Sequence, residues 1–332
     1  MRTKNTEIKN KKNFIFYSKY ESGHRREYIE YTGSYLGGIR GSLWKGCFSV
    51  KPFLFLMLEE SPILFFLISN LRSILKLKTV GLVFRAKECL ISKSVKHKIK
   101  KRLLTYLKSS KYITTYSIVP FYVCEQIKEV CDDWVYDFQF YDLEYLLSLG
   151  NCNQKEKFSR KLSENAKNRQ IICAIGKQDC QKGFDTFMFN YINCKELREK
   201  YLFISGGKID RKSIDSKLIR QFELAGGIVF DRRVTDSELI SMYEVSNYVW
   251  ACYSPEYDQS SGILGRALQF KKKVIVRKGS VSEQICENLN ANYIALPENS
   301  DILLSKLETI NSTTKPLNFL NPRNQKLIDN LM

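Results

Sequence analysis

The sequence predicts an α/β protein with two doubly wound parallel sheets, each in its own domain. In the C-terminal half, buried strands alternate with glycine loops and amphipathic helices, which is the order of a doubly wound sheet. The chain also opens with a strand, a glycine loop and a helix. Its 332 residues exceed one typical core and favour about two domains.

In the first half, the predicted strands are three short apolar runs, residues 13–18, 78–85 and 112–120. A loop follows the first strand, and a helix is predicted from Glu27. The apolar run 53–75 is broken by two glutamates and a proline, so we expect no transmembrane helix there. Two short helices joined at Ser61-Pro62 are predicted instead, either buried or at a membrane interface.

In the second half, residues 171–189 are predicted as a strand, a polar loop that holds Lys177 and Lys182, and a helix. Another helix is predicted to begin at Ser260-Ser261-Gly262, with Ser260 or Ser261 as its N-cap. Backbone N–H groups, two hydroxyls and Arg266 about one turn inside would make a phosphate site. The alternative is an ordinary capped helix whose arginine pairs with a carboxylate.

The order of these motifs resembles the donor-binding domain of GT-B glycosyltransferases of the retaining, family-4 type. The matching residues, which cover about 168–300, are Gly176-Lys177, Lys182-Gly183, Ser205-Gly206-Gly207 and Val234, Asp236, Glu238, Leu239 and Tyr243. The resemblance implies two Rossmann-like domains facing a central cleft, and a nucleotide-sugar donor. Lys177, Lys182, Ser260, Ser261, Gly262 and Arg266 would then bind the donor diphosphate.

One position departs from that family, which carries two glutamates with seven residues between them, on the sugar and the ribose of the donor. Here Arg266 stands at the second position, and Asp258 or the nearby Glu256 stands at the first. An arginine has only donors, so it suits the diphosphate better than ribose hydroxyls. The carboxylate that contacts the sugar stays open between Asp258 and Glu256.

By the same resemblance, the first glycine loop and a strand end of the N-terminal domain would face the cleft. Gly23 would let the backbone approach a ligand closely, and His24 and Arg25 could contact the acceptor or a phosphate. His24 as an exposed loop residue is the alternative. Arg85 is the last residue of the strand 78–85, at a position where the family often has a histidine near the reacting sugar. The resemblance therefore implies a catalytic role for Arg85.

The net charge limits the classes of binding partner that fit this protein, and the cysteines indicate its cellular compartment. The net charge of +18 calls for an anionic partner such as a nucleotide diphosphate, lipid headgroups or nucleic acid. The ten cysteines contain no CxxC pair and there are two histidines, so neither a metal site nor a cofactor is expected. Cysteines within apolar runs indicate a reducing compartment, the cytoplasm.

The predicted domains are an acceptor- and membrane-facing domain at 1–160, a donor domain at 161–312 and a tail helix at 313–332 packing back on the first. The polar stretch 148–168 is the predicted linker. The basic amphipathic helix at 92–110 is expected to be a solvated surface helix or to dock on anionic lipid headgroups.

The leading hypothesis is therefore a metal-independent, retaining glycosyltransferase at the inner face of the plasma membrane. It would act on a lipid-linked or oligosaccharide acceptor in O-antigen, capsule or exopolysaccharide synthesis. One alternative is a basic nucleic-acid-binding protein, although the sequence holds no recognised nucleic-acid motif. A catalytically inactive GT-B scaffold module is the other.

Overall fold

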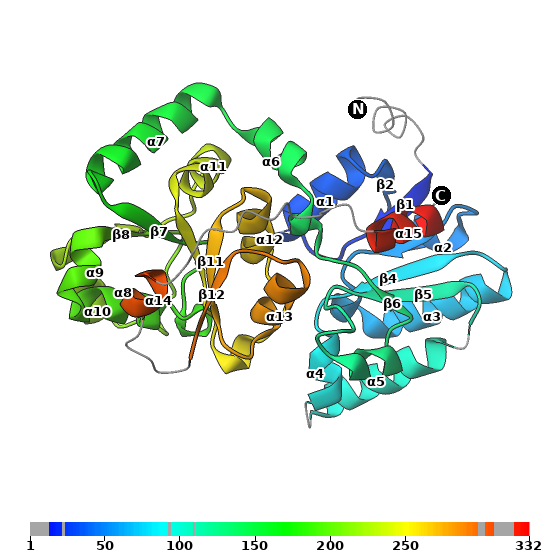
Figure 1. The fold of residues 1–332 in the computed structure, drawn as a ribbon. Coiled ribbons are helices and arrows are strands. Elements are labelled where there is room, and N and C mark those ends of the chain that lie inside the picture. Colours follow the sequence, from blue (N-terminus) through cyan, green and yellow to red (C-terminus); the bar gives the residue numbers. More distant parts are fainter. Residues whose placement is uncertain are drawn as a thin grey trace. The chain divides into compact units, whose positions relative to one another are not determined.

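The structure is a computed structural model that describes residues 13–21, 24–91, 94–108, 110–297, 303–308 and 322–331. The chain forms two compact units (Figure 1). Met1–Phe138 and Leu320–Met332 make up the first unit, and Gln139–Phe319 the second. The division thus falls before the boundary that the sequence suggested at residue 160.

The first unit contains a six-stranded sheet in the order β2-β1-β3-β4-β5-β6, with parallel pairing throughout. Its strands are β1 (Phe14–Tyr17), β2 (Gly38–Arg40), β3 (Phe53–Phe55), β4 (Thr79–Val83), β5 (Ile113–Ser117) and β6 (Asp133–Trp134). The strand order reverses between β1 and β3. In open α/β sheets, ligands bind beyond the carboxyl ends of the strands at such a reversal.

The helices of the first unit connect these strands. They are α1 (His24–Ser34), α2 (Leu43–Phe48), α3 (Pro62–Ile74), α4 (Ala86–Ile91), α5 (Val95–Leu107) and the tail helix α15 (Pro322–Leu331). The tail helix contacts this unit through an ion pair of 2.6 Å between Lys326 and Asp133, and through a hydrogen bond from Asn330 to Tyr116. No helix of the described residues is long and apolar enough to span a bilayer.

The second unit contains a sheet in the order β9-β8-β7-β10-β11-β12, again with parallel pairing. Its strands are β7 (Gln170–Ile175), β8 (Tyr201–Gly206), β9 (Ile228–Phe230), β10 (Tyr248–Ala251), β11 (Lys273–Arg277) and β12 (Tyr293–Leu296). Counted from β7, this is the 3-2-1-4-5-6 order of dinucleotide-binding folds, which reverses between β7 and β10. The predicted fold class, two doubly wound α/β sheets, is confirmed.

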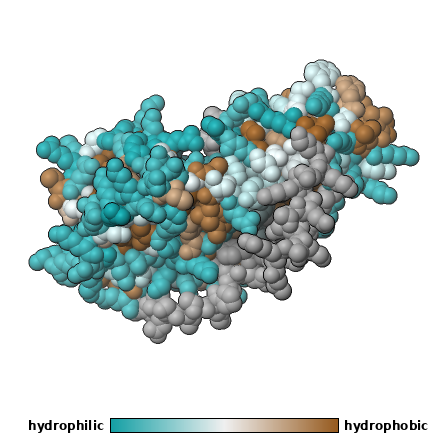
Figure 2. Space-filling view, turned by 90° about the horizontal axis from the view of Figure 1, so that it is seen from above, coloured by the Kyte–Doolittle hydropathy of each residue, from teal (hydrophilic) through white to brown (hydrophobic). Residues whose placement is uncertain are grey.

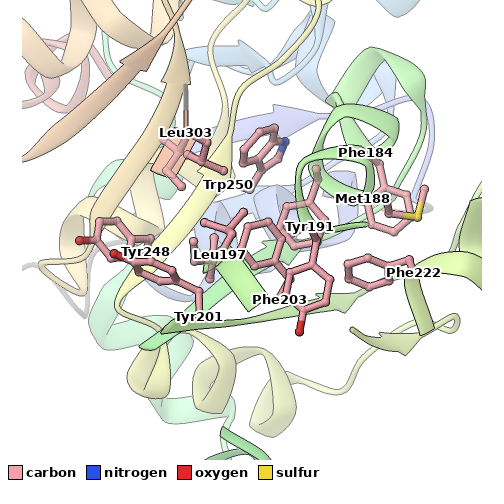
Figure 3. Close-up of a cluster of buried hydrophobic side chains, with 14 of the residues drawn as sticks. Phe184, Met188, Tyr191, Leu197, Tyr201, Phe203, Phe222, Tyr248, Trp250 and Leu303 are labelled. Atoms are coloured by element: carbon pink, nitrogen blue, oxygen red, sulfur yellow. The ribbon is translucent and has the colours of Figure 1, made fainter. Parts of the chain in front are cut away.

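Helices cover both faces of the second sheet (Figure 1). They are α6 (Leu143–Leu149), α7 (Cys152–Ala166), α8 (Phe184–Asn193), α9 (Lys195–Lys200), α10 (Ser216–Leu224), α11 (Asp236–Val245), α12 (Gly262–Gln269), α13 (Val281–Asn288) and α14 (Leu303–Glu308). Aromatic side chains dominate the core between the sheet and α8 and α10 (Figure 3). The ring of Phe187 lies 4.7 Å from that of Phe203 and 5.5 Å from that of Trp250, within the usual range for aromatic pairs.

Two predicted segments differ from the structure. In residues 53–75 the first part is β3, a fully buried inner strand, and not a helix. A 3-10 helix of three residues, Leu58–Glu60, follows it and meets α3 at the predicted junction Ser61-Pro62. The stretch 148–168 is not a linker, because α7 occupies most of it. Asn151 caps that helix by accepting a hydrogen bond from the Gln154 amide, and Leu162 and Ala166 are its buried residues. A narrow apolar side on an otherwise polar helix leaves little periodic signal in the sequence.

Candidate functional site

The candidate site lies at the reversal of strand order in the second sheet. Strand β7 ends at Ile175, and a loop leads from it to α8. Strand β10 ends at Ala251, and a second loop leads from it to α12. The two loops between these elements, residues 176–183 and 252–261, therefore start at the carboxyl ends of neighbouring strands. In a parallel sheet this is where a nucleotide is bound.

The first loop begins with a glycine and a paired lysine. Gly176 has a φ of +90°, which favours glycine, and its amide donates to the Gly206 carbonyl at 2.9 Å. Lys177 follows, and its ammonium lies 2.9 Å from Asp210 and 3.2 Å from Asp179. The hydrogen bond to Asp210 raises the pKa of Lys177, so the side chain stays charged. Its charge is largely offset by these two carboxylates.

The same loop ends at Gly183, where α8 begins against the end of β10. Gly183 has a φ of +64°, and a Cβ there would lie 2.2 Å from the carbonyl oxygen of Cys252. The indole N–H of Trp250 donates to the Gly183 carbonyl at 3.1 Å. No side chain caps the start of α8 at Gly183. This helix start is thus held at the carboxyl edge of β10 by contacts that only glycine allows.

We expect Gly183→Ala to cost more stability than the same change at Gly279, which shares its conformation. Gly279 has a φ of +75° but open space around its missing Cβ. The strain of a left-handed alanine, about 1 to 2 kcal/mol, applies to both variants. The clash with Cys252 applies to Gly183 alone. Urea unfolding of the two variants would test this, and equal losses would contradict the close approach of α8 and β10.

Lys182, next to Gly183, connects the two loops. Its Nζ lies 4.2 Å from the ring centroids of both Tyr253 and Tyr257, which is cation–π distance. Burial alone would lower the pKa of Lys182, but the two tyrosines outweigh it and the pKa is raised. Within the described residues, its ammonium lies against the two tyrosines and forms no ion pair with a carboxylate, in contrast to Lys177, although Asp179 also helps to raise its pKa. Its positive charge therefore remains available for an anion.

Tyr253 extends this contact to the start of α12. Its hydroxyl lies 2.7 Å from the Ser261 hydroxyl, and Ser261 caps α12 by accepting a hydrogen bond from the Leu264 amide. Burial raises the pKa of Tyr253, so its hydroxyl keeps its proton at neutral pH. The N-cap is thus Ser261, one of the two predicted serines. The other, Ser260, has a buried hydroxyl oxygen for which the structure describes no hydrogen-bond partner.

Gly262 and Arg266 on α12 face the chain that precedes α6. A Cβ on Gly262 would lie 1.4 Å from the side-chain oxygen of Gln139, so glycine is needed for packing there. The Arg266 guanidinium is buried and pairs with the buried Asp142 at 2.6 Å and 3.1 Å. This is the carboxylate pairing that the sequence left open. A guanidinium that is paired with a buried carboxylate is less available to a diphosphate.

The two carboxylates that the sequence offered for the sugar differ in the structure. Asp258 accepts a hydrogen bond from the Val281 amide at 2.8 Å and lies 3.3 Å from the Arg277 guanidinium. Asp258 thus accepts from the first amide of α13, whose N-cap is Ser280. Glu256 is exposed, and the neighbouring Ser254 side chain is the main cause that lowers its pKa. Of the two, Glu256 is the more accessible to a ligand.

The predicted residues of the first unit lie around the reversal between β1 and β3. Gly23 lies outside the described residues, and His24 is the first residue of α1 and not a loop residue. Arg25 pairs with Glu60, the last residue of the 3-10 helix Leu58–Glu60 that follows β3. Arg85, after β4, donates its backbone N–H to Glu59 at 2.8 Å, and its guanidinium lies 3.4 Å from Glu88. Arg25 and Arg85 are thus ion-paired.

Several residues of these sites were missed in the sequence. Glu59 and Glu60 were taken only as charges that interrupt an apolar run. Each has one buried carboxylate oxygen without a hydrogen-bond partner in the described structure. Their position at the end of the apolar run 53–58, the first part of which is β3, was the available signal. Tyr253 and Tyr257 carried no signal that separates them from core aromatics, because their contact with Lys182 joins two loops far apart in the chain.

The second unit thus presents a positive set of groups at one edge of its sheet. Lys182 supplies a charge, and the starts of α8 and α12 supply backbone N–H groups and the positive ends of two helix dipoles. In the described residues, no group of three or more His, Cys, Asp or Glu side chains gathers as metal ligands would. Such an arrangement can bind a phosphate or a diphosphate.

Comparison with solved structures places this geometry in a known fold. The chain superposes on Anabaena Alr3699/HepE in complex with UDP and glucose with a TM-score of 0.60, at 12% identity, over 90% of this chain and 89% of that one. WaaG, a glycosyltransferase involved in lipopolysaccharide biosynthesis, gives 0.51 at 12% identity over 96% and 92%. The N-terminal domain of Candida albicans trehalose-6-phosphate phosphatase gives 0.53 at 10% identity over 94% and 73%.

At this level of identity the likeness concerns the fold, which is that of GT-B proteins. No protein-family profile and no curated protein sequence matches the chain.

Proposed function

We propose that the protein is a glycosyltransferase that takes its sugar from a nucleoside diphosphate donor bound at the second unit. The observation that carries this is the position of Lys182. It lies at the strand-order reversal of a 3-2-1-4-5-6 sheet, between two helix starts, and its ammonium forms no ion pair with a carboxylate of the described residues. The GT-B likeness and the UDP bound to the Anabaena protein support a nucleotide sugar over other anions.

In this proposal, the second unit stabilises the charge that develops on the leaving diphosphate. As the bond between the anomeric carbon and the phosphate oxygen breaks, negative charge grows on that oxygen. Lys182 and the N–H groups at the starts of α8 and α12 would stabilise it without a metal ion. Lys177 would contribute less, because Asp210 and Asp179 offset its charge. Glu256 is the candidate for contact with the sugar, and retention of the anomeric configuration is part of the proposal.

The acceptor belongs to the proposal as well. We infer a lipid-linked or oligosaccharide acceptor at the inner face of the plasma membrane, in O-antigen, capsule or exopolysaccharide synthesis. The likeness to WaaG and the exposed basic residues of the first unit support this. Arg25, Arg85 and Glu60, beyond the carboxyl ends of β1, β4 and β3, are the polar side chains that an acceptor would meet there.

A catalytically inactive GT-B module is the second candidate, and the Arg266–Asp142 pair favours it. The family that the sequence resembles carries a glutamate at the position of Arg266, where it holds the ribose. Here the position belongs to a buried ion pair that joins α12 to the start of α6. Such a protein would bind a nucleotide diphosphate without transferring a sugar.

Thermal unfolding with UDP, GDP, ADP and CMP separates these candidates. We expect UDP or another nucleoside diphosphate to stabilise the second unit, and CMP, with one phosphate, to do so less. A ligand at a hundred times its Kd adds about 2.7 kcal/mol, which raises the Tm of a unit of this size by about 5 to 10 °C.

Three outcomes of that experiment are informative. Stabilisation together with release of the nucleotide from a nucleotide sugar supports the enzyme. Stabilisation without release or transfer supports the inactive module. If no nucleotide stabilises the protein while duplex DNA binds in a salt-sensitive manner, the donor-site assignment fails and a nucleic-acid partner takes its place.

A further inference from the structure

Helix α3 turns its apolar side towards solvent and its polar side inwards. Its buried residues are Phe65, Ser69 and Arg72. Its exposed face consists of large aliphatic residues at helical spacing, namely Ile63, Leu64, Leu67, Leu71 and Ile74. The outermost, Ile74, is 78% exposed, whereas Arg72, two residues earlier, is fully buried. A surface helix of a soluble protein normally has the opposite arrangement.

The buried Arg72 holds the neighbouring helix α2 beside α3. Its guanidinium donates to the backbone carbonyls of Gly46 at 2.6 Å, Ser49 at 2.7 Å and Lys51 at 2.7 Å. It also donates to the Lys78 carbonyl at 2.9 Å, which precedes β4. These bonds fix the end of α2 and the segment that leads into β3. The inward arginine therefore builds a rigid base under the outward apolar face.

Helices α2 and α5 extend the apolar face on both sides. On α2, Trp44 and Phe48 are stacked with ring centroids 6.1 Å apart, and Trp44 is 75% exposed. On α5, Tyr106 is exposed and its ring lies 5.6 Å from that of Phe66 on α3. We call the set of exposed residues on these elements the apolar surface: Trp44, Phe48, Val50, Ile63, Leu64, Leu67, Leu71, Ile74, Leu75, Val95, Ile99 and Tyr106.

Apolar side chains are also visible in the space-filling view. Figure 2 shows brown surface at the right-hand end, the end at which Figure 1 draws α2. An apolar area on several adjacent helices is larger than the single exposed leucines found on most soluble surfaces, and marks a site that binds a partner or a membrane.

The three segments that carry the apolar surface hold charges of one sign. The segments 42–51, 61–78 and 94–108 contain no Asp or Glu. They carry exposed basic side chains, namely Lys45, Lys76, Lys78, Lys96, Lys98 and Arg102. A second copy of this chain on the same surface would bring like charges together, because a two-fold interface pairs a patch with itself. Anionic lipid headgroups beside acyl chains complement both properties at once.

We propose that the apolar surface inserts into an anionic lipid bilayer, with α2, α3 and α5 lying in the interface plane and the surrounding lysines among the headgroups. This deepens the membrane location proposed above but is independent of sugar transfer, so it can hold if the transferase proposal fails. Insertion of Trp44 and the α3 face distinguishes this docking from adsorption by charge alone, which salt would abolish.

Vesicle sedimentation with the full chain tests the proposal. We expect binding to vesicles with 30% phosphatidylglycerol in phosphatidylcholine, and a fraction of it to persist at 0.5 M NaCl, where charges are screened within about 5 Å. Leu67→Ser with Ile74→Ser should weaken binding at least tenfold. Both residues are exposed, so the fold is kept. Leu224→Ser, on a 79% exposed leucine of α10 in the other unit, is the matched control and should bind as the wild type does.

Tryptophan fluorescence gives a second readout. Of the three tryptophans, Trp44 is exposed whereas Trp134 and Trp250 are buried, so a blue shift on adding vesicles reports on Trp44. Lipids brominated on the acyl chain should quench it. Unchanged binding of the Leu67/Ile74 double variant, or an unshifted spectrum of bound protein, would overturn insertion. Self-association that the same variant abolishes, without binding to vesicles, would overturn it in favour of a second copy.

Discussion

Replacing Arg266 by methionine is expected to lower the free energy of unfolding of the second unit by about 3 to 5 kcal/mol. The variant leaves the Asp142 carboxylate buried and without its cation. One amide hydrogen bond, from Gln269 at 3.1 Å, remains to it and cannot replace an ion pair. Urea unfolding followed by fluorescence measures the loss, since Trp250 is a core residue of that unit.

The double variant Arg266→Met with Asp142→Leu is the matched control. It removes both charges, so most of the lost stability should return. The same protein then tests the diphosphate role that the sequence suggested for Arg266. If the double variant is stable and binds a nucleoside diphosphate as the wild type does, the arginine is structural. A stable double variant with at least tenfold weaker nucleotide binding would restore Arg266 to the donor site.

Replacing Lys182 by alanine is expected to weaken nucleoside diphosphate binding about 10- to 150-fold. The reason is the loss of a charge-assisted hydrogen bond worth about 1.5 to 3 kcal/mol. The fold should persist, because the ammonium lies on the ring faces of Tyr253 and Tyr257, and Tyr253 keeps its hydroxyl contact with Ser261 when the lysine is removed. Isothermal titration with UDP and GDP measures the affinity, and the Tm without ligand checks the fold.

Lys177→Ala is the control for Lys182, since it removes the same charge from the same loop. We expect a smaller loss of affinity, because the charge of Lys177 is shared with Asp210 and Asp179 and its side chain is 60% exposed. An unchanged affinity in Lys182→Ala would remove the donor site from the second unit. A larger loss of affinity in Lys177→Ala than in Lys182→Ala would place the centre of the donor site at the start of the loop 176–183.

The sequence alone determined the fold class and the order of the donor motifs. Strand and helix periodicity are local properties, so runs such as 171–175 and 263–270 carried enough signal for two doubly wound sheets. The cap at Ser260 or Ser261, and the glycines at 176 and 183, followed from local backbone chemistry as well. Short buried elements were harder to predict from the sequence. Strand β3 was mistaken for a helix because three residues are too few to show a strand periodicity.

Only the tertiary structure decided which charged side chains are available to a ligand and which are paired with a carboxylate. Arg266 and Asp142 are 124 positions apart and Lys182 and Tyr253 are 71 apart, so neither pairing leaves a pattern in the sequence. Whether a lysine or arginine can meet a ligand depends on the carboxylate or ring folded against it. Arg72 of α3 is likewise explained only by its tertiary contacts. Its guanidinium points inwards because backbone carbonyls of three other segments accept its hydrogen bonds, and the apolar side of the helix therefore faces outwards.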